Sequence, residues 1–397
     1  MGNKWKTSFL TDHYIISSGL SKPAKDFGTG YPFLSFKDIF YNYFLPDSLT
    51  QLVQSTEKER VTCSVKRGDV FLTRTSETMH ELGMSSVALK DYANATFNGF
   101  CKRLRPKEKS ELEPEYVGYY LRSPLFRQNM LAFSTMSTRA SLNNEMISRL
   151  EISYPDRNIQ KKIANILLSL DKKTAILKTI NQTLEEMSQT LFKSWFVDFD
   201  PVIDNALDAG NPIPEALQSR AELRQKVRNS TDFKPLPAEI RSLFPSEFEE
   251  TELGWVPKGW QIKSLDHIAN FQNGLALQKF RPKNMEDDYL PVLKIADLRA
   301  GQITNDERAR TDISDSCKVY DGDMIFSWSG TLMIDIWTGG NAALNQHLYK
   351  VTSKKYPQSF YFMWTIQHLS RFQHIAEAKA VTMGHIKKGD LSNSFCL

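Results

Sequence analysis

Cysteine is scarce in this chain of 397 residues, and none of the four cysteines belongs to a CxxC pair. They are Cys63, Cys101, Cys317 and Cys396. A disulfide framework or a cysteine-rich zinc site is therefore not expected. No apolar run approaches the roughly 18 to 20 residues that a membrane-spanning helix needs, and the amino terminus lacks the apolar core of a secretion signal. We expect a protein of a reducing cytoplasm.

Motifs that would signal catalysis are also missing. No GxxxxGK[ST] loop is present to hold a nucleotide phosphate, and no GxGxxG follows a predicted strand. The seven histidines are dispersed, without the spacing of a metal site. The segment 211–214 (Asn-Pro-Ile-Pro) lacks the aromatic residue that ends the related motif of adenine methyltransferases. We therefore predict no catalytic residue and no metal ligand in this chain.

The composition is that of a globular protein, with 41% hydrophobic and 24% charged residues. The formal net charge is only +4, but it is unevenly distributed. Residues 1–155 carry a net charge of +4, residues 201–252 carry −4, and residues 253–397 carry +3. Two mildly basic blocks thus flank an acidic segment, which permits a nucleic-acid partner without requiring one.

Four segments of the first half recur, in the same order, in the second half. The offset between them decreases gradually from 259 to 244 residues, as small loop deletions would produce. The pairs are 31–39 with 290–298, 68–71 with 322–325, 94–99 with 341–346, and 138–142 with 382–386. Each match is weak and chance similarity is the alternative, but their common order indicates an internal repeat.

Each repeat is predicted to be a mixed α/β domain. The segments 32–36 and 291–295 are short and apolar, and 69–73 and 323–327 follow Gly-Asp turns, so all four are expected to be strands. Helical periodicity covers 116–133 in the first repeat and 359–376 in the second.

A long helix is expected to join the repeats. Apolar residues recur every seven positions, and no proline or glycine occurs between Asn158 and Asp200. The seam consists of Ile163, Leu170, Leu177, Leu184 and Leu191. A helix over about 158–194 would be roughly 55 Å long, and its stripe needs a partner, as in a coiled-coil spacer. A core helix that lies on one domain is the alternative.

The predicted organisation has four parts. Residues 1–155 form the first domain, 156–200 the helical spacer, 201–252 an acidic, proline-rich connector, and 253–397 the second domain. Pro201 must stop the long helix, and Trp195, Phe196 and Phe199 are expected to anchor its end by packing. Within the connector, only 214–228 has the pattern of a short, charged helix.

The chain resembles the specificity subunit of type I restriction–modification enzymes. The resemblance is carried by 159–164 (Ile-Gln-Lys-Lys-Ile-Ala), by 191–202 (Leu-Phe-Lys-Ser-Trp-Phe-Val-Asp-Phe-Asp-Pro-Val), and by 243–249 and 252–260, which follow in the expected order. It covers nearly the whole chain. It implies two target recognition domains, each reading one half of a bipartite DNA site in a bacterial or archaeal host, held apart by an antiparallel coiled coil.

In such a system the subunit itself would be non-catalytic and would bind no cofactor. It would dock two adenine methyltransferase subunits and, in the full enzyme, restriction subunits that translocate and cleave DNA. S-adenosylmethionine, ATP and Mg²⁺ would belong to these partners. The counterpart of 154–200 is missing after Leu397. We therefore expect the single heptad helix to pair with a second copy or with methyltransferase helices, so that a truncated subunit working as a dimer is one alternative.

Three pairs of corresponding segments combine hydroxyl, amide and basic side chains that suit phosphates and base edges. They are 73–76 with 327–331, 98–105 with 345–350, and 134–144 with 379–388. The predicted DNA contacts are Arg74, Thr75, Lys102, Arg103, Arg139, Asn143, Ser327, Trp328, Asn345, Gln346, His385, Lys387 and Lys388, with Lys279 and Arg281 on a separate polar loop. Self-capped turns and solvated connections are the alternatives for these segments. A structural turn is an equal alternative for Asn98 and Asn345.

The leading hypothesis is thus a DNA-reading specificity subunit. A self-contained DNA-modifying or DNA-cleaving enzyme is the runner-up, although the required cofactor motif is not found. A scaffold whose heptad helix binds only proteins is the third possibility.

Overall fold

The structure is a computed structural model, and it describes residues 5–397 except 77–81, 133–139, 285 and 379–383. The chain divides into two compact units, Met1–Ile180 and Asn181–Leu397, called unit 1 and unit 2 below. Among the helices of the described ranges, none combines the length and apolar character that crossing a bilayer requires.

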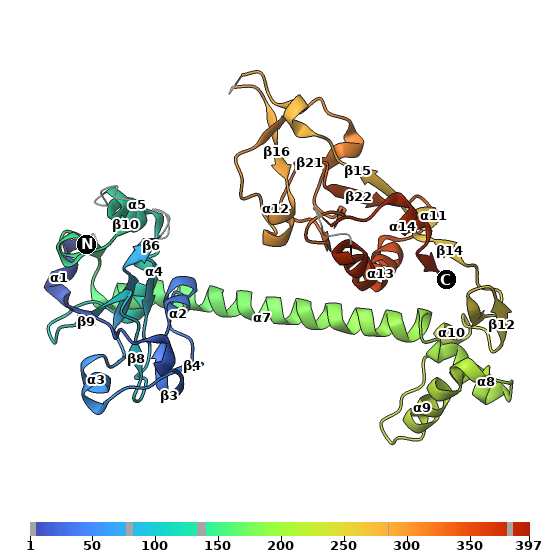
Figure 1. Cartoon of the computed structure of the whole chain (residues 1–397), viewed down its shortest axis with the longest axis horizontal. Coiled ribbons are helices and arrows are strands. Elements are labelled where there is room, and N and C mark those ends of the chain that lie inside the picture. The colour runs from blue at the N-terminus through green and yellow to red at the C-terminus, as the bar shows by residue number, and fades with distance from the viewer. Residues whose placement is uncertain (1–4, 77–81, 133–139, 285, 379–383) are drawn as a thin grey trace. The chain divides into compact units, whose positions relative to one another are not determined.

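Unit 1 contains two small sheets (Figure 1). An antiparallel sheet has the order β2-β9-β5-β7, and a second sheet has the order β4-β3-β8, in which β3 and β8 are parallel. Two short strand pairs, β1-β11 and β6-β10, complete the unit. The strands are β1 (Lys6–Phe9), β2 (Tyr14–Ser18), β3 (Phe27–Leu34), β4 (Gln51–Val53), β5 (Val70–Thr73), β6 (Thr75–Ser76), β7 (Ser85–Val87), β8 (Thr96–Phe97), β9 (Cys101–Pro106), β10 (Ala140–Ser141) and β11 (Glu151–Tyr154).

Short helices cover these sheets and close the core of unit 1. Val70 and Leu72 of the sheet pack with Val117, Phe126 and Met130 from two of the helices, and all five are buried. The helices are α1 (Leu10–His13), α2 (Phe36–Tyr41), α3 (Glu57–Thr62), α4 (Pro114–Tyr120), α5 (Pro124–Ala132) and α6 (Asn144–Ser148).

Unit 2 repeats this topology. Its antiparallel sheet has the order β15-β22-β19-β20, and a second sheet, β17-β16-β21-β18, contains the parallel pair β16-β21. The pair β14-β23 corresponds to β1-β11. The strands are β12 (Phe248–Thr251), β13 (Gly254–Pro257), β14 (Lys263–Ser264), β15 (Asn270–Asn273), β16 (Tyr289–Leu293), β17 (Arg308–Arg310), β18 (Lys318–Val319), β19 (Met324–Ser327), β20 (Met333–Ile336), β21 (Ala342–Leu344), β22 (Leu348–Thr352) and β23 (Phe395–Cys396). The predicted repeat and the mixed α and β class are confirmed.

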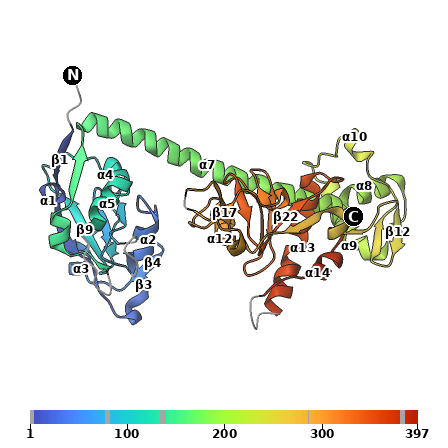
Figure 2. The same cartoon turned by 90° about the horizontal axis from the view of Figure 1, so that it is seen from above.

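In unit 2 a long helix packs on this framework, as α4 and α5 do in unit 1. The helix α13, red in Figure 2, buries Tyr361, Trp364 and Phe372 in the core that also contains Phe326. The helices are α8 (Asp200–Ala209), α9 (Gln218–Arg228), α10 (Ala238–Arg241), α11 (Leu265–Ile268), α12 (Ile295–Ala300), α13 (Gln358–Ala378) and α14 (Lys388–Ser392).

Two element predictions need correction. The pattern over 116–133 forms two helices, α4 and α5, because Pro124 cannot continue the first one and begins the second. The strands predicted to end at Phe36 and Ile295 end earlier, because these two residues begin α2 and α12. The strands after the Gly-Asp turns, β5 and β19, start within one residue of the prediction.

The two Gly-Asp turns are held by the same contacts. The carboxylate of Asp69 accepts a hydrogen bond from the main-chain N–H of Lys66 at 2.8 Å and pairs with Arg105 at 2.6 Å. In unit 2, Asp323 accepts from the N–H of Tyr320 at 2.8 Å and pairs with Lys350 at 2.7 Å. Each aspartate thus ties its turn to the central strand next to it.

The predicted long helix is present as α7 (Arg157–Phe196), with 40 residues. Its first turns belong to unit 1, where Gln160 and Ala164 are buried and Ile163 packs against the core. Its last turns belong to unit 2, where the Phe192 ring lies 5.2 Å from that of Trp364. Between these ends the apolar stripe is exposed; Leu177, for example, is 59% exposed.

The connector is folded, contrary to the expectation of a tether with one short helix. Phe199, Val202 and Phe244 form a buried cluster, against which Trp195 and Trp260 pack. Three aspartates of α8 pair with three arginines of α9, spaced four residues apart on both helices. The pairs are Asp200 with Arg220, Asp204 with Arg224, and Asp208 with Arg228. Because a spacing of four keeps the side chains on one helix face, the pairs form a ladder.

Candidate nucleic-acid interface

In unit 1 the main chain joins the three segments that were predicted to contact DNA. The strand β6 pairs with β10, with Thr75 opposite Ser141. The N–H of Arg74 donates to the carbonyl of Phe100 at 2.8 Å, and the N–H of Leu142 donates to the carbonyl of Arg74 at 2.8 Å. Arg74 therefore lies between the other two segments.

Unit 2 brings the corresponding segments together in the same way. Trp328 corresponds to Arg74. Its main-chain carbonyl accepts the N–H of Ile386 at 3.1 Å, and its own main-chain N–H donates to the carbonyl of His347 at 3.4 Å. A bridge between Ser329 and His385 takes the place of β6-β10. One three-segment cluster is thus present in each unit: 73–76, 98–102 and 140–143 in unit 1, and 327–331, 345–347 and 384–388 in unit 2.

The cationic side chains of the first cluster lie close together. Arg74 is exposed, whereas Lys102 is 8% exposed and donates from Nζ to the Ser18 hydroxyl at 2.9 Å. Burial, together with the positive charge of Arg74, lowers the pKa of Lys102. A neighbouring anion such as a phosphate would relieve this repulsion.

Two predicted contacts are contradicted by burial. Arg103 is 6% exposed, and its Nη1 donates to the carbonyls of Thr62 at 3.3 Å and Ser64 at 2.6 Å. Ser327 is fully buried, and its hydroxyl donates to main-chain carbonyls at 3.1 and 2.8 Å. Both side chains hold their own unit together and cannot reach DNA.

Asn345 stabilises a turn, which was the alternative to a base contact for this residue. Its Oδ1 accepts the N–H of His347 at 3.1 Å, just as Oδ1 of Asn98 accepts the N–H of Phe100 at 2.7 Å. Asn143 also has a structural task, because its Oδ1 caps α6 through the N–H of Met146 at 2.8 Å, although the residue is exposed. Arg139 lies outside the described residues.

The second cluster carries polar and aromatic side chains. Nδ1 of His347 lies 2.9 Å from the Ser329 hydroxyl, and its Nε2 lies 3.3 Å from Nε2 of Gln346. The ring of Trp328 lies 5.9 Å from that of His347 and 6.2 Å from that of His385. Lys387 and Lys388 are exposed at the start of α14.

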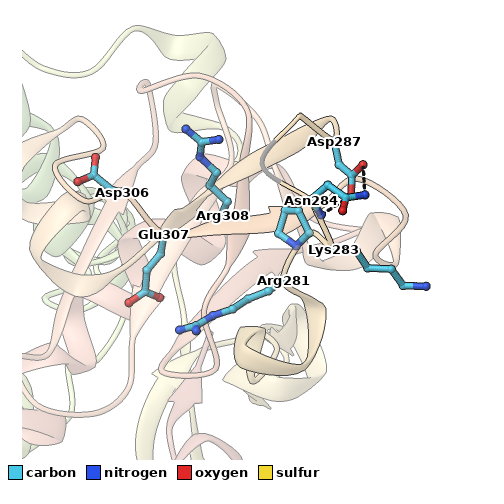
Figure 3. A pocket seen from close by; sticks show the side chains of 8 residues that line it. Arg281, Lys283, Asn284, Asp287, Asp306, Glu307 and Arg308 are labelled. Carbon is cyan, nitrogen blue, oxygen red and sulfur yellow. Dashed lines mark hydrogen bonds between the residues drawn. The ribbon is translucent and has the colours of Figure 1, made fainter.

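Lys279 and Arg281 lie in a different part of unit 2, in the segment before β16. Arg281 lines an open hollow of about 520 Å³ (Figure 3). Asp287, Asp306 and Glu307 line it together with Lys283 and Arg308. Because both charge signs are present, the hollow does not favour a phosphate.

The heptad stripe remains a candidate partner surface. Leu170, Leu177, Leu184 and Leu191 are about half exposed, between 49% and 59%, whereas Ile163 packs in unit 1. In the described part of the chain, no group of three or more potential metal ligands comes together.

Phe100 is an exposed residue of the first cluster that was not among the predicted contacts. Its side chain is 63% exposed and it follows Asn98 and Gly99 directly. The signal was available, because the repeat offset of 247 residues that pairs Asn98 with Asn345 also pairs Phe100 with His347.

Comparison with known proteins agrees with this architecture. Residues 3–186 and 257–394 match the family described as Type I restriction modification DNA specificity domain. The type I restriction enzyme HindI specificity subunit of Haemophilus influenzae is 29% identical over 315 residues, which cover 74% of this chain and 66% of that protein. The MjaIX specificity subunit of Methanocaldococcus jannaschii is 22% identical over 99% of this chain and 82% of that protein.

Among solved structures, a type I restriction–modification system S subunit from M. genitalium has 12% identity and a TM-score of 0.47, covering 96% of this chain and 83% of that one. The chain spans slightly less than two thirds of the Haemophilus relative. The two matched segments together cover most of the sequence, one in each half. This chain therefore belongs to the type I restriction–modification DNA specificity domain family.

Proposed function

We propose that this chain is the DNA-reading subunit of a type I restriction–modification system. The observation that carries the proposal is the recurrence of the three-segment cluster, with the same main-chain contacts but different side chains. Arg74 and Phe100 stand in unit 1 where Trp328 and His347 stand in unit 2. Two copies of one scaffold that present different side chains suit two different half-sites.

The subunit performs no chemistry in this proposal. It docks adenine methyltransferase subunits and, in the complete system, restriction subunits. Exposed Arg74, Lys387 and Lys388 suit phosphate and base contacts, and Gln346 offers an amide for adenine. Thr75 lies in the β6-β10 strand pair, and His385 forms the bridge to Ser329 that takes the place of this pair in unit 2.

The exposed stripe of α7 is proposed to bind a helix of a second copy of this chain or of a methyltransferase subunit. Leu184 and Leu191 are 54% and 49% exposed, and a heptad stripe is the pattern by which helices pair. An isolated helix of this length gains most of its stability from such packing.

A binding assay with the methyltransferase subunit tests the proposal. Duplex DNA that carries the methylated site is titrated with the complex at several salt concentrations, and a shuffled duplex serves as the control. We expect tight binding of the site, weaker binding of the control, and a steep loss of affinity with salt, because phosphate contacts release counterions. Equal binding of both duplexes would contradict sequence reading.

A further inference from the structure

Phe100 has a fixed main chain and a free side chain. Its N–H donates to Oδ1 of Asn98 at 2.7 Å, and its carbonyl accepts the N–H of Arg74 at 2.8 Å. The preceding Gly99 donates to the carbonyl of Leu20 at 2.9 Å, and a Cβ on Gly99 would collide with the Ser21 hydroxyl. The turn is thus held on both sides, while the phenyl ring remains 63% exposed.

The Phe100 ring does not contribute to the core, because Phe100 belongs to no core cluster of unit 1. Single exposed apolar side chains are common on protein surfaces. This one, however, lies beside the exposed cation Arg74, in the cluster that we propose to face DNA. Because its main chain is already fixed, Phe100 loses little backbone conformational entropy when a ligand covers its ring.

The counterpart in unit 2 has the opposite chemistry. His347 occupies the same place in the turn. Its imidazole is within hydrogen-bonding distance of the Ser329 hydroxyl and the Gln346 side-chain amide. The same position therefore offers an apolar ring in unit 1 and polar groups in unit 2. A position whose side chain differs between the two units, on a main-chain turn that both units share, is suited to setting specificity.

We propose that Phe100 is a specificity-determining residue that contacts the C5 methyl of a thymine in the half-site read by unit 1. The inference rests on the proposed function. The thymine methyl is the apolar group of the major groove, and aromatic side chains contact it directly. Arg74, which is exposed, would hold a flanking phosphate, a contact that carries no sequence information but fixes the register.

The test replaces thymine by uracil, which removes only the methyl group. The methylated site is first determined by methylome sequencing of a host that carries the wild-type complex. Duplexes in which each thymine of the site is replaced singly are then titrated with the complex of this chain and its methyltransferase subunit. We expect one replacement to weaken wild-type binding about 4-fold, the factor for burying one methyl-sized group.

The variant Phe100→Ala should bind the thymine and uracil duplexes equally, and Phe100→Leu should retain part of the difference. Phe9→Ala is the matched control, since Phe9 is 46% exposed on the separate β1-β11 pair. Gln346→Ala should leave the thymine-to-uracil difference in the first half-site unchanged.

The inference is overturned if no single replacement weakens wild-type binding, or if Phe100→Ala discriminates as well as wild type does. A half-site without thymine on either strand would also overturn it. These outcomes differ from a failure of the proposed function, in which the wild-type complex would give no bipartite methylated site at all.

Discussion

The α-carbon of Gly19 lies against the main chain of Asn98, so closely that a Cβ at this position would approach the Asn98 carbonyl oxygen to less than 3.0 Å. Gly274 stands in the same relation to Asn345 in unit 2. The residue after each glycine forms a parallel β-bridge with the same asparagine, Leu20 with Asn98 and Leu275 with Asn345. Each glycine thus permits the turn on which its three-segment cluster is built.

Gly19→Ala and Gly274→Ala should therefore each destabilise their own unit. The added methyl meets main-chain oxygens that cannot move without breaking the turn, and we expect a loss of about 2 kcal/mol in the free energy of unfolding. Urea unfolding followed by circular dichroism measures it. Gly389→Ala is the control, because open space surrounds that position. Equal stability of all three variants would contradict the close approach.

Lys387→Ala should weaken DNA binding without affecting folding or assembly. Lys387 is an exposed residue of the cluster of unit 2, and loss of one phosphate contact should lower the slope of log affinity against log salt by about 1. Salt titrations of the complex with its methyltransferase subunit measure the slope. Lys354→Ala, which removes an exposed cation from the β22–α13 loop, should bind like wild type. An unchanged slope for Lys387→Ala would remove this residue from the interface.

Leu177→Glu should abolish pairing of α7 and leave the fold intact. The side chain is 59% exposed, so the stability of the isolated chain should change by less than about 0.5 kcal/mol. A charge in the apolar stripe opposes helix pairing. Sedimentation at several concentrations, with and without the methyltransferase subunit, reports assembly. Lys178→Glu, one residue away and off the stripe, is the control, and assembly of Leu177→Glu at wild-type strength would count against the pairing surface.

Asp208→Asn should make the connector less stable at neutral pH, and the difference from wild type should shrink in acid. Hydrogen bonds from Arg241 and Arg228 lower the pKa of Asp208 below its ordinary value. A carboxylate with a lowered pKa stabilises the fold above its unfolded pKa of about 3.9, and this contribution is lost as the pH falls through the folded value.

The effect should stay below about 1 kcal/mol, because the carboxylate is 44% exposed and solvent screens it. Urea unfolding at a series of pH values compares the variant with wild type, and Asp232→Asn is an exposed control in the same segment. A stability difference that grows in acid would contradict the ion-pair network.

Periodicity and repetition were enough to predict the long helix and the two similar domains. The heptad spacing from Ile163 to Leu191 depends only on local sequence, and the strands after the Gly-Asp turns are short, fully buried runs. The folded connector was not foreseen, since its ladder joins residues 20 positions apart on two helices. Its aromatic cluster likewise depends on tertiary packing.

Prediction of individual contact residues was less successful, for a physical reason. Arg103 and Ser327 are polar, but both are buried and donate to main-chain carbonyls of their own unit, and composition cannot distinguish such a side chain from one that faces a ligand. Phe100 is apolar, so a search for side chains that hydrogen-bond to phosphates or base edges does not select it. Aligning the two repeats position by position would have placed it opposite His347.

The methylome of a host that carries this chain with its methyltransferase partner tests the central claim most directly. We predict an adenine-methylated site with two specified halves of different sequence, separated by an unspecified spacer, that disappears when the gene for this chain is deleted. Substitutions in the cluster of unit 1 should alter one half, and substitutions in the cluster of unit 2 should alter the other. A methylome that is unchanged by the deletion would contradict the assignment of this chain as the DNA-reading subunit.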